Sequence, residues 1–311
     1  MREPDHPVIE IMSTIIARAI TNDSIFLNRN SNHSTDSIGS SAAYIAVVSS
    51  VQKKIKTLLM ELQKFLADIE SQPELAIHGI RKRTKYIRAL LAIDPASATE
   101  LRGCMKKLSS ILASYRDARV NLDTYQTIIQ INNSLTNPAI ETRLKQNSFL
   151  AKQLPVDTEL EIIKHLLEDF IAQLESCSHA ISDDQMLQRI ESSFHSGKKG
   201  LERVKREANV RAIHAWRKKT KLLWYQLRFL FGDELEEHEH PLVLSNALGK
   251  LLGEIHDLDV LMKVLDLQPE HPFNLWVQEL RQNQVVHSLK LGHTLYVQQR
   301  STFYHILKPI H

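Results

Sequence analysis

Two nine-residue segments of nearly the same sequence, 77–85 and 213–221, lie 136 residues apart in this chain of 311 residues. Seven of the nine positions are identical or exchange Arg for Lys. A second matching pair, 115–120 and 255–260, follows in the same order at an offset of 140 residues. Because both motifs recur in the same order and at nearly the same offset, the sequence predicts an internal duplication. The fold must then be one that two related halves can build.

The residues between these motifs favour helices. Apolar residues recur at helical spacing almost everywhere after residue 42, and no segment alternates polar and apolar residues for long enough to predict a strand. Prolines such as Pro73, Pro138, Pro241 and Pro272 stand where helices should begin or end. We therefore predict an all-α fold of two pseudo-symmetric helical bundles. The expected helices cover residues 43–71, 74–93, 97–131, 138–152, 156–176, 183–206, 209–231, 241–266 and 272–306.

The chain divides into three parts on the same grounds. Residues 1–41 are predicted to be an N-terminal segment that is partly flexible, because residues 21–41 are rich in Ser, Asn and Asp. Residues 42–180 are predicted to form the first half of the helical bundle, and residues 181–311 the second. Apolar residues make up 43% of the chain, which is enough to bury a core.

The sequence predicts a cytoplasmic protein without a membrane segment. No apolar run is long enough to span a bilayer. The first twenty residues carry Asp5 and Glu10 and lack the basic-then-apolar layout of a signal peptide. The two cysteines, Cys104 and Cys177, follow no metal spacing, and two cysteines in a chain of this length do not make a disulfide scaffold.

Charge is segregated along the chain although the net charge is only +3. Residues 78–88 contain five Lys or Arg and no acid, and residues 198–221 contain ten Lys or Arg against two acids. Residues 157–191 have the opposite character, with nine acids against two bases. Such a chain can present a strong local field despite its small total charge.

Each repeated segment predicts a helix with one basic face. At about 100° per residue, the basic side chains fall on one arc and the apolar side chains, such as Ile80 and Leu223, on the opposite side. In the first half the arc holds His78, Arg81, Lys82, Lys85 and Arg88. In the second half it holds His214, Arg217, Lys218, Lys221 and Arg228. Arg83 falls off the arc and is expected to be a solvated charge.

A row of like charges repels itself, so an isolated helix gains nothing from this pattern. A ligand that supplies negative charge would make it favourable, and phosphate oxygens suit Arg forks and Lys ammonium groups. The basic neighbours should disfavour protonation of His78 and His214, which we expect to act as anion contacts or hydrogen-bond donors. We therefore predict a polyanion-binding surface.

The second repeated motif contributes supporting residues. Asp117 and Asp257 recur at matching places and are expected to orient an Arg or Lys. Lys106 shares a predicted helical face with Asp117, and Lys250 shares one with Asp257, so these lysines could join the basic surface. The supporting candidates are Arg116, Asp117, His256, Asp257, Lys106 and Lys250.

The segment 196–200, Ser-Gly-Lys-Lys-Gly, is expected to interrupt a helical stretch. Two interpretations of it remain open. Backbone freedom beside two lysines suits contact with phosphate, and a plain turn would have the same composition.

The duplicated His-x-x-Arg-Lys-x-x-Lys pattern, followed about 40 residues later by Arg-Asp or His-Asp, resembles the CHAD family, the conserved-histidine α-helical domain. The resemblance spans residues 42–308. It implies two pseudo-symmetric helical bundles with a basic groove between them, binding of inorganic polyphosphate, and association with polyphosphate granules. Carried over by position, it assigns this binding to the same ten basic-arc residues. One departure is Trp224, which stands where the first half has Arg88, with Arg228 one turn further on.

Neither the residues nor the resemblance predicts catalysis, a cofactor or a metal site, and three alternatives remain open. His256 and Asp257 form the dipeptide of HD-type metal phosphohydrolases, for which His214 and Asp266 could complete the ligand set. A basic cleft could also bind nucleic acid or another polyanion. In the third alternative the chain is a helical scaffold, whose acidic segment 157–191 merely neutralises the basic one.

Overall fold

The computed structural model describes residues 50–93, 98–151, 157–176, 181–232 and 240–307, and within these ranges it contains helices and no strand. This confirms the all-α prediction. None of these helices combines the length and apolarity that crossing a membrane requires. The helices are α2 (Ser50–Ala67), α3 (Pro73–Leu90), α4 (Ala98–Ile111), α5 (Ala113–Ile131), α6 (Pro138–Ala151), α7 (Asp157–Ser176), α8 (Asp183–Glu207), α9 (Val210–Phe231), α10 (Pro241–Leu265), α11 (Pro272–His293) and α12 (Arg300–Leu307), with a 3-10 turn η1 (Asn133–Leu135) and a π-helical turn η2 (Thr294–Gln298).

Local sequence explains where several of these helices begin. Pro73, Pro241 and Pro272 occupy the first turns of α3, α10 and α11, where a missing backbone N–H costs nothing. The side chain of Ser182 accepts a hydrogen bond from the backbone of the third residue of α8, in a reciprocal capping box. Asn209 caps α9 by accepting from the Ala212 backbone at 2.8 Å.

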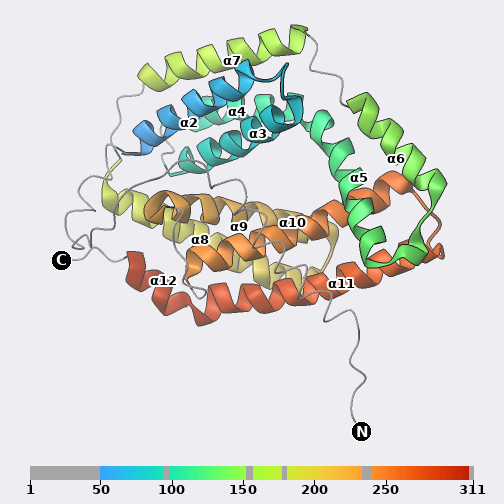
Figure 1. Ribbon diagram of the computed structural model, residues 1–311. Coiled ribbons are helices and arrows are strands. Elements are labelled where there is room, and N and C mark those ends of the chain that lie inside the picture. Colours follow the sequence, from blue (N-terminus) through green and yellow to red (C-terminus); the bar gives the residue numbers. More distant parts are fainter. Residues whose placement is uncertain (1–49, 94–97, 152–156, 177–180, 233–239, 308–311) are drawn as a thin grey trace, which may run out of the picture.

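The helices form two groups, as Figure 1 shows. α2, α3, α4 and α7 lie together in one group, and α8 to α11 lie in the other, while α5 and α6 stand at one side. The groups meet where α3 packs against α9, and α5 packs against α10 of the second group. The two helices that carry the repeated basic motif are therefore neighbours in space.

One large apolar core runs through both groups. Ile80 and Leu101 from the first group and Trp216 and Leu248 from the second are almost wholly buried in it. A smaller core joins α5, α6, α10 and α11, where Tyr125 packs on Phe273 with ring centroids 5.6 Å apart. Burial of these side chains fixes how α3 and α9 are presented to each other.

Two of the expected helices are divided in the structure, and the ends of the others lie within a few residues of those expected where the structure describes them. The expected helix 97–131 is broken at Leu112, a buried residue whose φ of −83° and ψ of 5° leave the helical range. The expected helix 272–306 consists of α11, the π-helical turn η2 and α12. The N-terminal segment 1–41 lies outside the described residues. The internal duplication stays a prediction.

The prediction that segment 196–200 interrupts a helix is wrong, because these residues lie inside the continuous helix α8. Its two glycines serve close packing. A Cβ atom added to Gly200 would lie 2.5 Å from the indole ring of Trp216, and one added to Gly197 would overlap the ring of Tyr296. Glycine is needed at both positions so that buried aromatic rings can pack against the helix backbone. Close packing thus explains the two glycines of this segment, and no phosphate-binding loop is required.

Trp216 also touches Gly292 of α11, where an added Cβ atom would lie 2.5 Å from the ring. Because Gly200 abuts the same ring, the indole has no room to move away. We expect Gly292→Ala to destabilise the fold by roughly 1–3 kcal/mol in chemical denaturation, as overpacked cores do. The control is Gly103→Ala in α4, where the added Cβ atom meets nothing within 4 Å and should stabilise the helix slightly. A Gly292→Ala protein as stable as the wild type would contradict this packing.

Candidate functional site

The basic face of α3 is the first part of the site. His78, Lys85 and Arg88 are exposed, whereas Arg81 and Lys82 are partly buried. The opposite face is fully buried, with Ile80, Thr84 and Ile87 each at 0% exposure. The burial pattern therefore agrees with the amphipathic helix expected from the sequence.

Two arginines of α3 are held by other parts of the first group. The Arg81 guanidinium donates a hydrogen bond to the backbone carbonyl of Ser109 at 3.0 Å, which links α3 to the end of α4. Arg83 forms an ion pair with Glu61 of α2 at 2.8 Å and lies over the ring of Phe65 at 4.7 Å. The expectation that Arg83 is merely a solvated charge is wrong, because α2 places an acid and a ring beside it.

The basic face of α9 is the second part, and it is less exposed than that of α3. Lys218 is exposed, whereas His214, Arg217, Lys221 and Arg228 are partly buried. The packing face of α9 contains Trp216, Leu223 and Leu227, each at 0% exposure, and the fourth expected member, Leu230, is only partly buried. α10 packs along α9, and the Arg217 and Lys221 side chains lie over its glycines Gly253 and Gly249.

The two helices meet through aromatic side chains. The rings of Tyr86 from α3 and Tyr225 from α9 stack with centroids 5.1 Å apart. Close by, Gln226 donates to the backbone carbonyl of Ala89 at 3.3 Å. The Arg228 guanidinium lies 5.4 Å from the centre of the Tyr86 ring, so a basic side chain of α9 reaches onto α3. The structure thus brings the two sequence-predicted basic helices into direct contact.

Cations surround the aromatic rings of this junction. Trp224 carries the Lys221 ammonium at 4.4 Å and the Arg228 guanidinium at 5.6 Å from its ring centre. Lys54 of α2 lies 5.7 Å from the centre of the Tyr86 ring. Ring faces attract cations through their quadrupole, which positions these side chains without adding a negative charge.

α10 supplies a histidine beside the α9 face. The rings of His214 and His256 have centroids 4.5 Å apart. Burial, together with the nearby His256, Lys218 and Arg217, lowers the pKa of His214 to about 4, against a smaller opposing influence of Asp259. His214 is therefore a neutral imidazole at neutral pH, as the basic neighbourhood led us to expect.

The remaining supporting candidates are spread over three helices. Lys106 is exposed on α4 and Asp117 is exposed on α5, so the break at Leu112 removes the continuous helical face that was expected to join them. Arg116 belongs to α5, but its side chain is outside what the structure describes. Lys250 and His256 belong to α10 and, like Asp257 on the same helix, are partly buried.

Glu254 is a member of the site that the sequence reasoning missed. Burial, together with the carboxylate of Asp257, raises its pKa from the ordinary 4.5 to about 7, against the opposing influence of Lys250. Gln284 of α11 donates a hydrogen bond to it at 3.1 Å. Its spacing, four residues after Lys250 and three before Asp257, could have indicated that the three share one face.

Lys54 is the second residue that was missed. It belongs to α2, which carries neither repeated motif, so nothing in the sequence linked it to the basic faces. Only the folded arrangement places it and Arg228 against the same ring of Tyr86.

The metal-dependent alternative requires His214, His256, Asp257 and Asp266 to converge. The two histidines are close, but Asp266 forms the C-terminal cap of α10, more than two helical turns beyond Asp257. Within the described ranges, no group of three His, Cys, Asp or Glu side chains is arranged to hold a metal ion. The described residues thus do not assemble the ligand set of that alternative.

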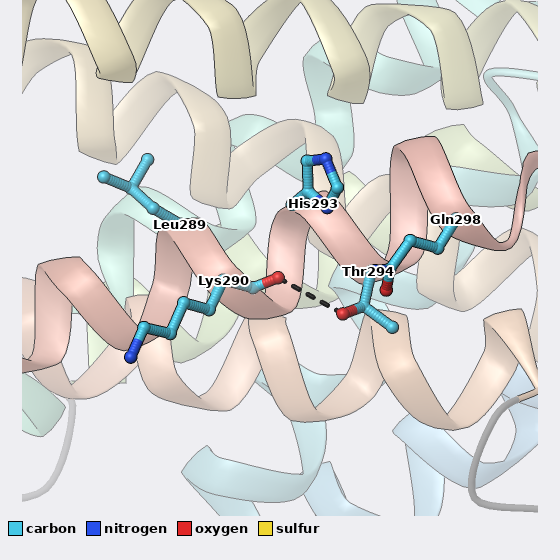
Figure 2. A pocket seen from close by; sticks show the side chains of 5 residues that line it. All are labelled: Leu289, Lys290, His293, Thr294 and Gln298. Carbon is cyan, nitrogen blue, oxygen red and sulfur yellow. Dashed lines mark hydrogen bonds between the residues drawn. The ribbon is translucent and has the colours of Figure 1, made fainter.

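A surface hollow lies elsewhere, on α11 and η2, and Figure 2 displays the side chains that line it. They are Leu289, Lys290, His293, Thr294 and Gln298. The hydroxyl of Thr294 is turned back to the Lys290 backbone carbonyl at 3.3 Å. None of the predicted contact residues lines this hollow, so it is separate from the basic faces.

Comparisons with known proteins agree with this architecture. Residues 50–266 match the family model of the CHAD domain. Among solved structures, the chain is similar to the crystal structure of the CHAD domain from the plant Ricinus communis, with a TM-score of 0.55 and 18% identity over 88% of this chain and 93% of that chain. At that identity the likeness shows the fold alone. No curated protein matches the chain.

The raised pKa of Glu254 predicts a pH dependence of stability. The folded chain holds this proton more tightly than the unfolded chain, so the free energy of unfolding should fall as pH rises from about 4.5 to about 7 and then level off. Glu254→Gln mimics the protonated group. We expect this variant to gain stability over the wild type with rising pH, reaching at most about 3 kcal/mol above pH 7.

Urea denaturation of both proteins across this pH range measures the difference. His214, whose lowered pKa makes stability rise with pH between about 4 and 6.5, is present in both proteins and cancels. A difference between the proteins that does not vary with pH would contradict the assignment to Glu254.

Proposed function

The chain belongs to the CHAD family, and we propose that it binds inorganic polyphosphate, without catalysis, on the surface formed by α3 and α9. The observation that carries this proposal is the direct contact of two basic helices through Tyr86 and Tyr225. The two rows of positive side chains are 136 residues apart in the sequence but lie on neighbouring helices. This arrangement suits one long anion better than two separate ones. Such binding would also recruit the protein to polyphosphate granules.

The energy of such binding comes from many weak contacts. An exposed ion pair contributes only ~0.2–1 kcal/mol. The eight Lys and Arg of the two basic arcs, converging on one multivalent chain with release of its counterions, could reach about −8 kcal/mol, which corresponds to micromolar affinity or better. Lys54 would extend the surface onto a third helix.

The aromatic side chains favour a plain phosphate chain over nucleic acid. Proteins that bind single strands offer open ring faces on which bases stack. Tyr86 and Tyr225 are buried, at 5% and 6% exposure, and stack on each other. Trp224 carries Lys221 and Arg228. These rings therefore contact cations or each other. The surface is suited to binding the charge of phosphate groups rather than to stacking nucleic-acid bases.

Removal of four positive charges, two from α3 and two from α9, tests the proposal. The variant Arg81→Gln, Lys85→Gln, Arg217→Gln and Lys221→Gln keeps polar stems but removes the charge. We expect polyphosphate affinity to fall at least about tenfold in a fluorescence titration, with a shallower dependence on salt. Circular dichroism should show the same helix content as in the wild type.

The matched control removes four charges elsewhere on the protein. Lys145, Lys164, Arg203 and Lys205 each sit in an exposed ion pair within their own helix. Their change to Gln alters the net charge equally and should change affinity by less than about threefold. If the two quadruple variants lose affinity equally, binding reflects net charge and the α3–α9 surface is the wrong assignment.

A further inference from the structure

Lys221 is confined at both ends of its side chain. Its stem lies against the backbone of α10 at Gly249, where an added Cβ atom would come within 2.9 Å of the Lys221 Cδ and Cε atoms and 3.3 Å of Nζ. Its ammonium group lies 4.4 Å from the ring centre of Trp224, one turn along its own helix. Gly249, which lacks a side chain, and the ring of Trp224 are thus two of the contacts that confine Lys221.

The same helix pair accommodates a second cation more loosely. Arg217 lies one turn before Lys221 on α9, and Gly253 lies one turn after Gly249 on α10. A Cβ atom added to Gly253 would lie 3.5 Å from the Arg217 Nε atom, which is an ordinary contact. The two pairs run in opposite directions along the two helices. Gly249 and Gly253 therefore leave space on α10 for the Lys221 and Arg217 side chains of α9.

We propose that Gly249 and Trp224 are positioning residues, which set the Lys221 ammonium group in place before the polyanion arrives. This inference rests on the proposed function. A free lysine has many rotamers, and ordering it when a ligand binds weakens the affinity. Gly249 and Trp224 restrict those rotamers beforehand, and the ring adds no negative charge that would compete with phosphate.

If Gly249 served only to allow close packing, Gly249→Ala would destabilise the fold. Glycine is a poor helix former, so alanine should favour α10 unless the core is disturbed. The atoms that an alanine at position 249 would meet are the outer carbons of a flexible lysine. The side chain can swing away while the backbone stays in place, so we expect a folded protein with a displaced Lys221.

Three alanine variants of the full chain form a graded series. Gly103→Ala meets nothing within 4 Å, Gly253→Ala makes an ordinary contact with Arg217, and Gly249→Ala displaces Lys221. In polyphosphate titrations we expect Gly103→Ala and Gly253→Ala to bind within about twofold of the wild type. Gly249→Ala should bind roughly 2- to 10-fold more weakly, while its thermal midpoint stays equal to or above that of the wild type.

A double-mutant cycle with Lys221→Met assigns the effect to Lys221. If Gly249 acts through this lysine, Gly249→Ala should leave affinity unchanged once Lys221 is replaced. An equal loss of affinity in both backgrounds, or wild-type binding by Gly249→Ala, would overturn the inference.

A measurement without ligand separates this inference from the proposed function. The Trp224 ring should shift the NMR signals of the Lys221 Cε methylene group upfield, and Gly249→Ala should abolish that shift whereas Gly103→Ala keeps it. A wild-type protein that shows the shift but does not bind polyphosphate would refute the proposed function alone. Absence of the shift in the wild type would refute the positioning of Lys221.

Discussion

The arrangement depends on the contact between α3 and α9, two helices that each carry a row of positive charge. Like charges on neighbouring helices repel, so apolar and aromatic packing must hold the pair together. The stacked rings of Tyr86 and Tyr225 and the hydrogen bond from Gln226 to the Ala89 carbonyl make this contact. The large shared core behind them, to which Ile80 and Trp216 belong, supplies the burial that offsets the repulsion.

Several cations of the two basic faces contact neutral groups. Arg81 donates to a backbone carbonyl, Lys221 and Arg228 lie on aromatic rings, and the Lys221 stem lies along a glycine of α10. A carbonyl or an aromatic ring orients a cation without itself contributing a negative charge. Arg83, which falls off the basic arc, is paired with Glu61.

Periodicity and proline positions were enough to predict the helical fold, since the helices bury one face and several of them begin at a proline or a capping side chain. They did not predict the break at Leu112, where no proline or glycine marks the bend. The basic faces followed from spacing along single helices, but contacts between helices did not. Lys54 meets Tyr86, and Gly249 meets Lys221, only because distant helices pack together. The expected interruption at 196–200 was wrong because glycines that admit buried rings look like loop glycines in a sequence.

The central claim is that one surface, built by α3 and α9, selects a phosphate chain. The most direct test is a competition titration of labelled long-chain polyphosphate against single-stranded DNA and heparin at two salt concentrations. The account predicts tight binding that DNA displaces poorly, because the rings of the junction are occupied by cations and by each other. Equal displacement by every polyanion, with binding lost at modest salt, would contradict it and leave only a general attraction between opposite charges.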